Sequence, residues 1–118
     1  MSTAASILTG VVAGLHVYFL VLEMFLWTTP YGRRVFGMTE AQAQATKVLA
    51  ANQGLYNGFL AAGLVWGLRT GDFRVQGFFL GCVVVAGVYG AATASRRILF
   101  IQALPAAVAL MLSWFARG

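Results

Sequence analysis

Residues 5–27 read ASILTGVVAGLHVYFLVLEMFLW, and only His16 and Glu23 in this run carry a charge near neutral pH. A helix needs about 20 mostly apolar residues to cross the hydrocarbon layer of a membrane, because each residue rises about 1.5 Å. The run is long enough, and it lacks the period-two alternation of a barrel strand. It therefore predicts a membrane-spanning helix. An α-helix satisfies the hydrogen bonds of its backbone groups within itself, as the lipid environment requires.

Three further apolar segments follow the first and are of similar length. We predict an all-α, integral membrane four-helix bundle, with residues 1–118 as one domain and spans at about 5–27, 46–68, 73–94 and 98–115. A polar helical lead-in from Thr39, a plausible N-cap, precedes the second span. Pro105 predicts a kink in the fourth span, because proline removes a helical hydrogen bond.

The composition supports a membrane protein. Of the 118 residues, 60% are hydrophobic and 9% are charged, whereas a soluble domain has about 25% charged residues. The net charge of +5 comes from basic residues placed singly or in pairs between apolar runs, which predicts contact with anionic membrane lipid and excludes nucleic acid. One cysteine, Cys82, and one histidine make no disulfide and no zinc pattern, so no metal site is predicted.

The basic residues also predict an orientation. Five lie on the side of the first and third connections (Arg33, Arg34, Lys47, Arg96 and Arg97), and three lie on the other side (Arg69, Arg74 and Arg117). Because positive charge is enriched on the cytoplasmic side, both termini are expected outside in a multi-pass protein of the inner (plasma) membrane.

Polar side chains in the run AANQGLYNGFL, residues 50–60, predict a site inside the membrane. Successive helix residues are about 100° apart, so one helix face carries Asn52, Gln53, Tyr56 and Asn57. An unpaired amide in hydrocarbon costs on the order of several kcal/mol, so these groups need partners. His16 and Glu23, two turns apart on the first span, are the expected partners.

These residues favour an enzyme or binding protein for a lipophilic small molecule. Tyr56, Glu23 and His16 are the catalytic candidates, as proton donor or acceptors, and Asn52, Gln53 and Asn57 are the substrate-binding candidates. A haem bound through His16 is an alternative cofactor. Two other functions stay open: a small proton-coupled exporter with Glu23 as its coupling carboxylate, and a structural or accessory subunit in which the amides only fasten helices together.

Glycines recur at four-residue spacing in three of the four predicted spans. The pairs are Gly10 with Gly14, Gly54 with Gly58, Gly63 with Gly67, and Gly77 with Gly81. Small residues at this spacing let helix backbones approach closely in lipid. We therefore expect a homo-oligomer, with the Gly54 and Gly58 face near its centre.

The segments YGRRVFGMT (31–39) and AANQGLYNGFLAAGLVWG (50–67) resemble the family of small bacterial membrane proteins called domain of unknown function 1304. The resemblance covers essentially the whole chain. It implies four spans and no known chemistry.

Residues 33–57 are similar in layout to the membrane-associated eicosanoid and glutathione metabolism proteins, a superfamily of four-helix trimers that act on lipophilic electrophiles. This resemblance implies a trimer over a dimer. Asn57 matches the superfamily pattern, but Leu49 and Asn52 stand where arginines are expected, Gln53 replaces an asparagine and Tyr56 a glutamate. Glutathione binding is therefore not expected, because its carboxylates would lack their arginine partners.

Overall fold

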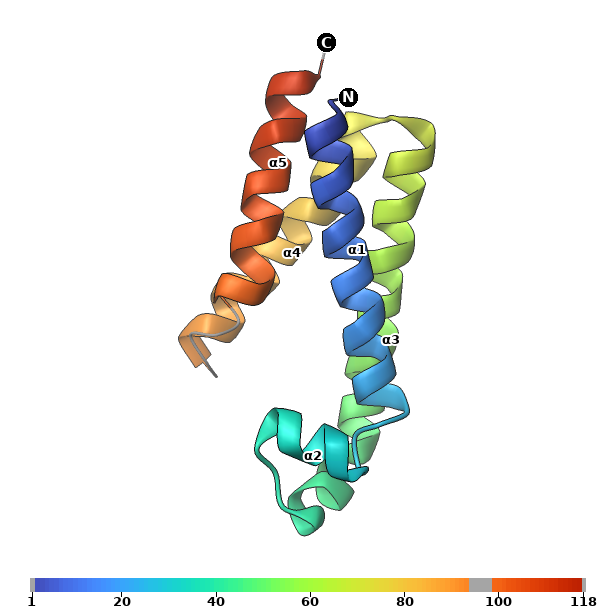
Figure 1. Ribbon diagram of the computed structural model, residues 1–118, viewed down its shortest axis with the longest axis vertical. Coiled ribbons are helices and arrows are strands. Elements are labelled where there is room, and N and C mark those ends of the chain that lie inside the picture. Colours follow the sequence, from blue (N-terminus) through green and yellow to red (C-terminus); the bar gives the residue numbers. More distant parts are fainter. Residues whose placement is uncertain (1, 94–98, 118) are drawn as a thin grey trace. The chain divides into compact units, whose positions relative to one another are not determined.

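The computed structural model describes residues 2–93 and 99–117 and shows an all-α chain with no strand in these ranges. Its elements, shown in Figure 1, are the α-helices α1 (Thr3–Met24), α2 (Pro30–Phe36), α3 (Glu40–Thr70), α4 (Phe73–Thr93) and α5 (Leu104–Ala116), with a π-helical turn, η1 (Leu99–Ala103), directly before α5. The predicted turn at 95–97 lies outside the described residues.

Two helices are long and apolar enough to cross a membrane. They are α1, with a mean hydropathy of 2.0, and α4, with a mean hydropathy of 1.8. They correspond to the first and third predicted spans. The predicted second span lies within α3, a 31-residue helix whose amides and charged residues lower its hydropathy. The predicted fourth span falls on η1 and α5, and α5 has only 13 residues.

Pro105 explains why the fourth segment is not one continuous α-helix. It occupies the first turn of α5, where its missing N–H leaves no helical bond unmade. The preceding residues, Leu99–Ala103, form the π-helical turn. Irregular turns of this kind are found where a helix bends, so the change of helix type falls where the proline predicts a kink.

The predicted start of the second long helix is confirmed. The hydroxyl of Thr39 accepts a hydrogen bond from the Gln42 backbone N–H at 3.1 Å, and the Gln42 side chain accepts one from the Thr39 N–H at 2.9 Å. This reciprocal pair satisfies two backbone donors at the helix end. The sequence signal is a threonine followed three residues later by glutamine.

The short helix α2 was not predicted. Thr29 caps it by accepting a hydrogen bond from the Gly32 N–H at 3.2 Å, Pro30 fills its first turn, and Gly37 ends it with a φ of 65°. Each of these residues suits its position, since proline fits a first turn and glycine tolerates the left-handed conformation. The Thr-Pro and Phe-Gly pairs therefore mark the two ends of this helix in the sequence.

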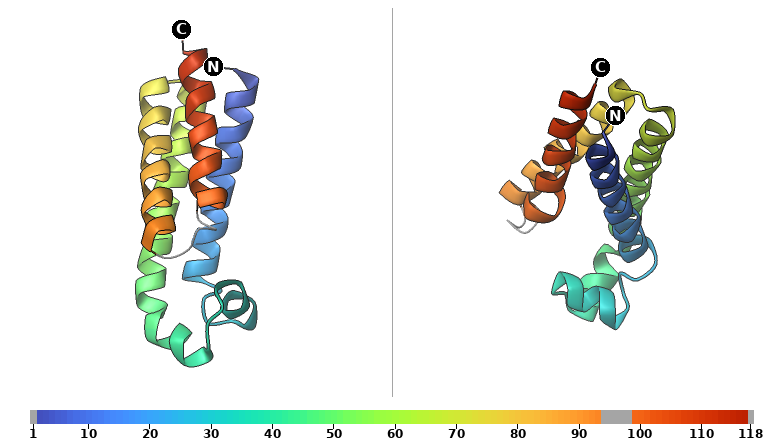
Figure 2. Two further views of the ribbon diagram at one scale, coloured as in Figure 1. Left: turned by 90° about the vertical axis from the view of Figure 1, so that its left-hand side faces the viewer. Right: turned by 45° about the horizontal axis from the view of Figure 1, so that its top comes forward.

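The chain divides into two compact units, which are described separately. The terminal unit comprises Met1–Gly14 and Leu60–Gly118, and the middle unit comprises Leu15–Phe59. In the terminal unit the start of α1 lies beside α5, as both views of Figure 2 show. The core of this unit consists of Val12, Ala13, Leu64, Leu80, Val83, Ala106 and Ala109.

A buried polar cluster joins three helices of the terminal unit. The Gln76 side-chain amide on α4 donates hydrogen bonds to Thr9 Oγ1 on α1 at 2.7 Å and to Ser113 Oγ on α5 at 3.0 Å. All three residues are at most 1% exposed. Interhelical bonds of this kind are worth about 0.6–2 kcal/mol in a membrane. Gln76, the one amide in the predicted third span, was a signal that the sequence analysis did not use.

Close packing in the terminal unit predicts a glycine that cannot be replaced. A Cβ at Gly87 would lie 2.7 Å from the backbone nitrogen of Ala103, whereas a Cβ at Gly81 would have nothing within 4 Å. We expect Gly87→Val to lower the free energy of unfolding by about 1–3 kcal/mol relative to Gly81→Val. Thermal unfolding in mild detergent measures the difference, and equal losses in the two variants would contradict the packing.

Candidate functional site

Gly54 brings α3 against α1 within the middle unit. A Cβ at this position would lie 2.7 Å from Met24 Cγ, 3.1 Å from Glu23 Cβ and 3.2 Å from the Leu20 carbonyl oxygen. A Cβ at Gly58 would lie 2.7 Å from Leu20 Cδ1. The close approach therefore depends on Gly54, whereas a Cβ at Gly58 would meet only the flexible end of the Leu20 side chain. The Gly54 and Gly58 face, which we expect near the centre of a homo-oligomer, packs on α1 of the same chain.

The close approach sets Asn57 beside Glu23. The Asn57 side-chain amide donates a hydrogen bond to the Glu23 carboxylate. Asn57 is 6% exposed, and Glu23 is half-buried. Hydrogen bonds to a charged group are about twice as strong as neutral ones. This contact links α1 and α3 in the middle unit.

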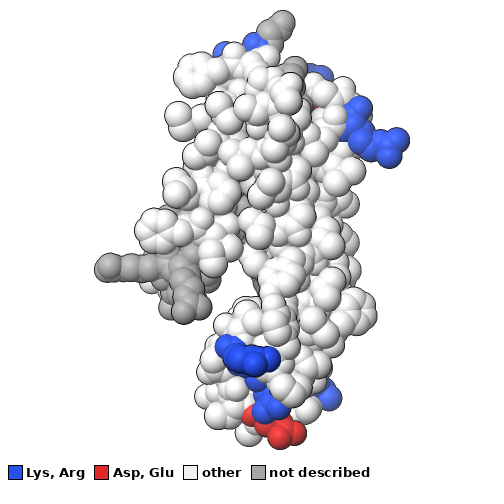
Figure 3. Space-filling model, viewed as in Figure 1, with Lys and Arg blue, Asp and Glu red and all other residues white. Residues whose placement is uncertain are grey.

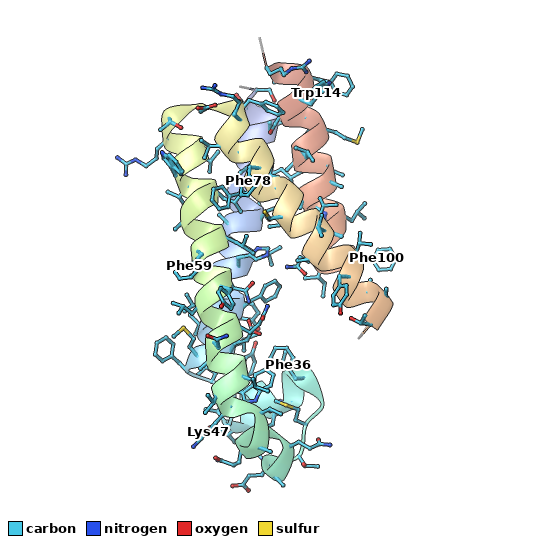
Figure 4. All side chains as sticks on the ribbon, turned by 180° about the vertical axis from the view of Figure 1, so that it is seen from behind. Phe36, Lys47, Phe59, Phe78, Phe100 and Trp114 are labelled. Carbon is cyan, nitrogen blue, oxygen red and sulfur yellow. The ribbon has the colours of Figure 1, made fainter. Side chains whose placement is uncertain are left out.

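Glu23 also lines a small pocket at the end of α1. The pocket has a volume of about 310 Å³, and its other walls include Met24, Trp27, Lys47 and Ala51. Trp27 is held in place by a 3.0 Å hydrogen bond from its indole Nε1 to Thr46 Oγ1, and Lys47 is labelled in Figure 4. The pocket thus combines a carboxylate, an ammonium group and apolar side chains, as small-molecule sites do.

The three other predicted polar residues on α3 are not brought to Glu23. Asn52 and Gln53 are exposed, and Tyr56 is 51% exposed, with its ring edge-on to Phe59. Consecutive helix residues point about 100° apart, so burying Asn57 turns Tyr56 aside. The expectation that all four side chains converge on Glu23 therefore does not hold within the middle unit.

His16 is fully buried, and its ring meets Phe19 edge to face at 5.4 Å between centroids. It lies two turns before Glu23 on α1. A bond from its imidazole to haem iron would need this packing to open. No group of three or more His, Cys, Asp or Glu side chains suited to a metal ion occurs among residues 2–93 and 99–117.

A second polar contact in the middle unit was missed by the sequence analysis. The hydroxyls of Tyr18 on α1 and Tyr31 on α2 are hydrogen-bonded to each other. Both residues are exposed, at 42% and 44%. This hydrogen bond links α2 to α1. The two tyrosines are 13 positions apart, and no sequence pattern at that spacing predicts the contact.

These features define a small, all-helical protein with two helices able to cross a membrane and a carboxylate–amide contact beside a pocket. The chain belongs to the family described as a protein of unknown function, DUF1304, which matches residues 10–114. A curated relative, the uncharacterized protein YpaA of Lactococcus lactis subsp. lactis (strain IL1403), is 29% identical over 98% of this chain and 100% of its own length. No solved structure matches the chain significantly.

Proposed function

We propose that this chain is a four-span protein of the bacterial inner membrane that binds a lipophilic small molecule at Glu23. Two helices of membrane length support the membrane part of the proposal. For the second and fourth spans, the 31-residue length of α3 and the apolar character of residues 100–116 give support. The bias of basic residues favours both termini outside.

The observation that carries the binding proposal is the position of Glu23. Its carboxylate is held by Asn57 and also lines the apolar-walled pocket. Placing an ionisable side chain at membrane depth costs free energy, so its presence there favours a functional role. A helix contact alone could be made by two neutral amides. The Glu23 carboxylate would accept a hydrogen bond from a ligand N–H or O–H, while apolar walls such as Met24 and Trp27 would hold its hydrocarbon part.

An enzymatic role would use Glu23 as the base, since this carboxylate lies at the pocket. Tyr56, Asn52 and Gln53 would join it only through a second copy of the chain, because all three are exposed. The homo-oligomer supplies such a copy. Gly10 and Gly14 of α1 form a four-residue pair that is open to that contact, since a Cβ at either would have nothing within 4 Å. The preference for a trimer over a dimer rests on the superfamily resemblance, and native mass spectrometry tests it.

We expect the Glu23→Gln variant to lose its ligand. The protein is purified in mild detergent, and small molecules extracted from it are identified by mass spectrometry. Because hydrogen bonds to charged groups are worth about 1.5–3 kcal/mol, retention should fall about tenfold or more. Glu40→Gln is the matched control, since Glu40 is exposed and outside the pocket. Equal ligand content in wild type and Glu23→Gln would rule the binding proposal out.

Proton-coupled export is the second candidate, favoured by one observation. Glu23 is the only acidic residue within the two membrane-length helices. Such a carboxylate can alternate between a proton and a cationic substrate. Export requires that lipophilic cations release protons from the purified protein and that Glu23→Gln abolishes the release. If the pH does not change when substrate is added, proton-coupled export is ruled out and the binding proposal remains.

A further inference from the structure

An apolar groove runs between the beginning of α4 and the end of α5 in the terminal unit, with a volume of about 790 Å³. Its walls include the aromatic side chains of Phe78 and Phe115 and the thioether of Met111, which are 66%, 78% and 59% exposed. Figure 4 labels Phe78 on α4 and Trp114 on α5, one from each wall. Gly77 also lines the groove and has no side chain to fill it.

The groove has a basic end. The Arg117 guanidinium lies 3.2 Å from the centroid of the Trp114 ring and donates a hydrogen bond to the Trp114 carbonyl oxygen at 2.9 Å. The hydrogen bond uses one of the five guanidinium N–H donors, so four stay available to a ligand. Together the two contacts hold the positive charge beside a wall of the groove. Arg74, which lines the groove, is 90% exposed and pairs with Asp72 at 3.4 Å.

Charges at this end do not cancel. Arg69 lies in the last turn of α3 and Asp72 in the connection to α4, so this end carries three guanidinium groups and one carboxylate. Hydrogen bonds from Arg74 hold the pKa of Asp72 below its ordinary value, so Asp72 stays negative at neutral pH. The net charge of these four groups is +2, from three positive groups and one negative. Figure 3 shows basic side chains at this end of the terminal unit and largely uncharged side chains along the rest of its visible face.

We propose that this groove binds a phospholipid with an anionic headgroup, its phosphate at Arg117 and Arg74 and an acyl chain along the aromatic walls. Arginine suits a phosphate because its planar donors match the phosphate oxygens. Basic recesses between membrane helices are known to bind anionic headgroups. A symmetric contact with a second copy would bring Arg117 near Arg117, and like charges disfavour it.

The proposal is tested by native mass spectrometry of the full chain in equimolar phosphatidylglycerol and phosphatidylcholine with identical chains. Each arginine near a membrane surface contributes about 1 kcal/mol toward an anionic lipid, which converts to about a fivefold preference. Asp72 offsets the charge of Arg74, which leaves one net positive charge, that of Arg117, at the proposed phosphate site. We therefore expect wild type to retain phosphatidylglycerol about fivefold over phosphatidylcholine. Arg117→Gln should bring the ratio close to one, and Arg34→Gln, which removes an exposed charge in the middle unit, should leave it unchanged.

A second pair of variants tests the apolar part. Gly77→Leu fills the groove, whereas Gly81→Leu adds the same side chain to α4 at a position outside the groove where nothing lies within 4 Å. We expect Gly77→Leu to lose both lipids and Gly81→Leu to keep them. Equal retention of the two lipids by wild type, or a ratio that Arg117→Gln does not move, would overturn the proposal. So would a lipid-free dimer that Gly77→Leu separates, because the occupant would then be a second copy.

Discussion

Replacing Gly54 with leucine is expected to separate α1 from α3 in the middle unit and to cost about 3 kcal/mol of stability or more. Even a Cβ there would lie 3.2 Å from the Leu20 carbonyl oxygen and 3.1 Å from Glu23 Cβ, and neither atom is the end of a flexible side chain. Overpacking alone costs about 1–3 kcal/mol. The displaced helix would also break the Asn57–Glu23 hydrogen bond, which adds about 1.5–3 kcal/mol.

The matched control for this prediction is Gly81→Leu. A Cβ at Gly81 would have nothing within 4 Å, so the added side chain meets open space. Thermal unfolding in mild detergent, together with the yield of monodisperse protein, compares the two variants. If Gly54→Leu unfolds at the same temperature as Gly81→Leu, the close approach of α1 and α3 is not what stabilises the middle unit.

The sequence predicted helix positions well because helix length and end signals are local. The apolar run ending near Trp27 and the Thr39 cap each depend on residues within one or two turns, and α1 ends at Met24, three residues before the predicted end. Packing of the fourth segment was less predictable. Pro105 marks the start of α5, whereas the close approach of Ala103 in η1 to Gly87 joins residues 16 positions apart, and no local signal predicts it.

The sequence only partly predicted which polar side chains contact each other. The polar face of α3 was identified, but its rotation is set by the small residues Ala43, Ala50 and Gly54, which are buried on the same face as Asn57. Small residues mark the side of a helix that approaches a neighbour closely. Had this stripe been used, Asn57 would have been the amide predicted to face Glu23, and Tyr56 would have been placed on the exposed side.

Removing both partners of the Asn57–Glu23 contact should be less damaging than removing either one. Asn57→Leu leaves the Glu23 carboxylate without its amide donor, and Glu23→Leu leaves a buried amide without its acceptor. Each single change should cost about 1–3 kcal/mol, because an unsatisfied buried polar group keeps its desolvation penalty. The double variant replaces both groups with apolar side chains, so we expect it to be more stable than either single variant.

A double-mutant cycle on unfolding in detergent measures this coupling, which should be about 0.5–3 kcal/mol. Glu40→Leu combined with Asn57→Leu is the control, because Glu40 is exposed and lies 17 positions before Asn57 on α3. Effects of that pair should add. Additive effects of Glu23→Leu and Asn57→Leu as well would show that the two side chains do not act on each other. A coupled pair whose double variant folds but holds no ligand would separate the two roles of Glu23, since the fold can do without the carboxylate and the proposed pocket cannot.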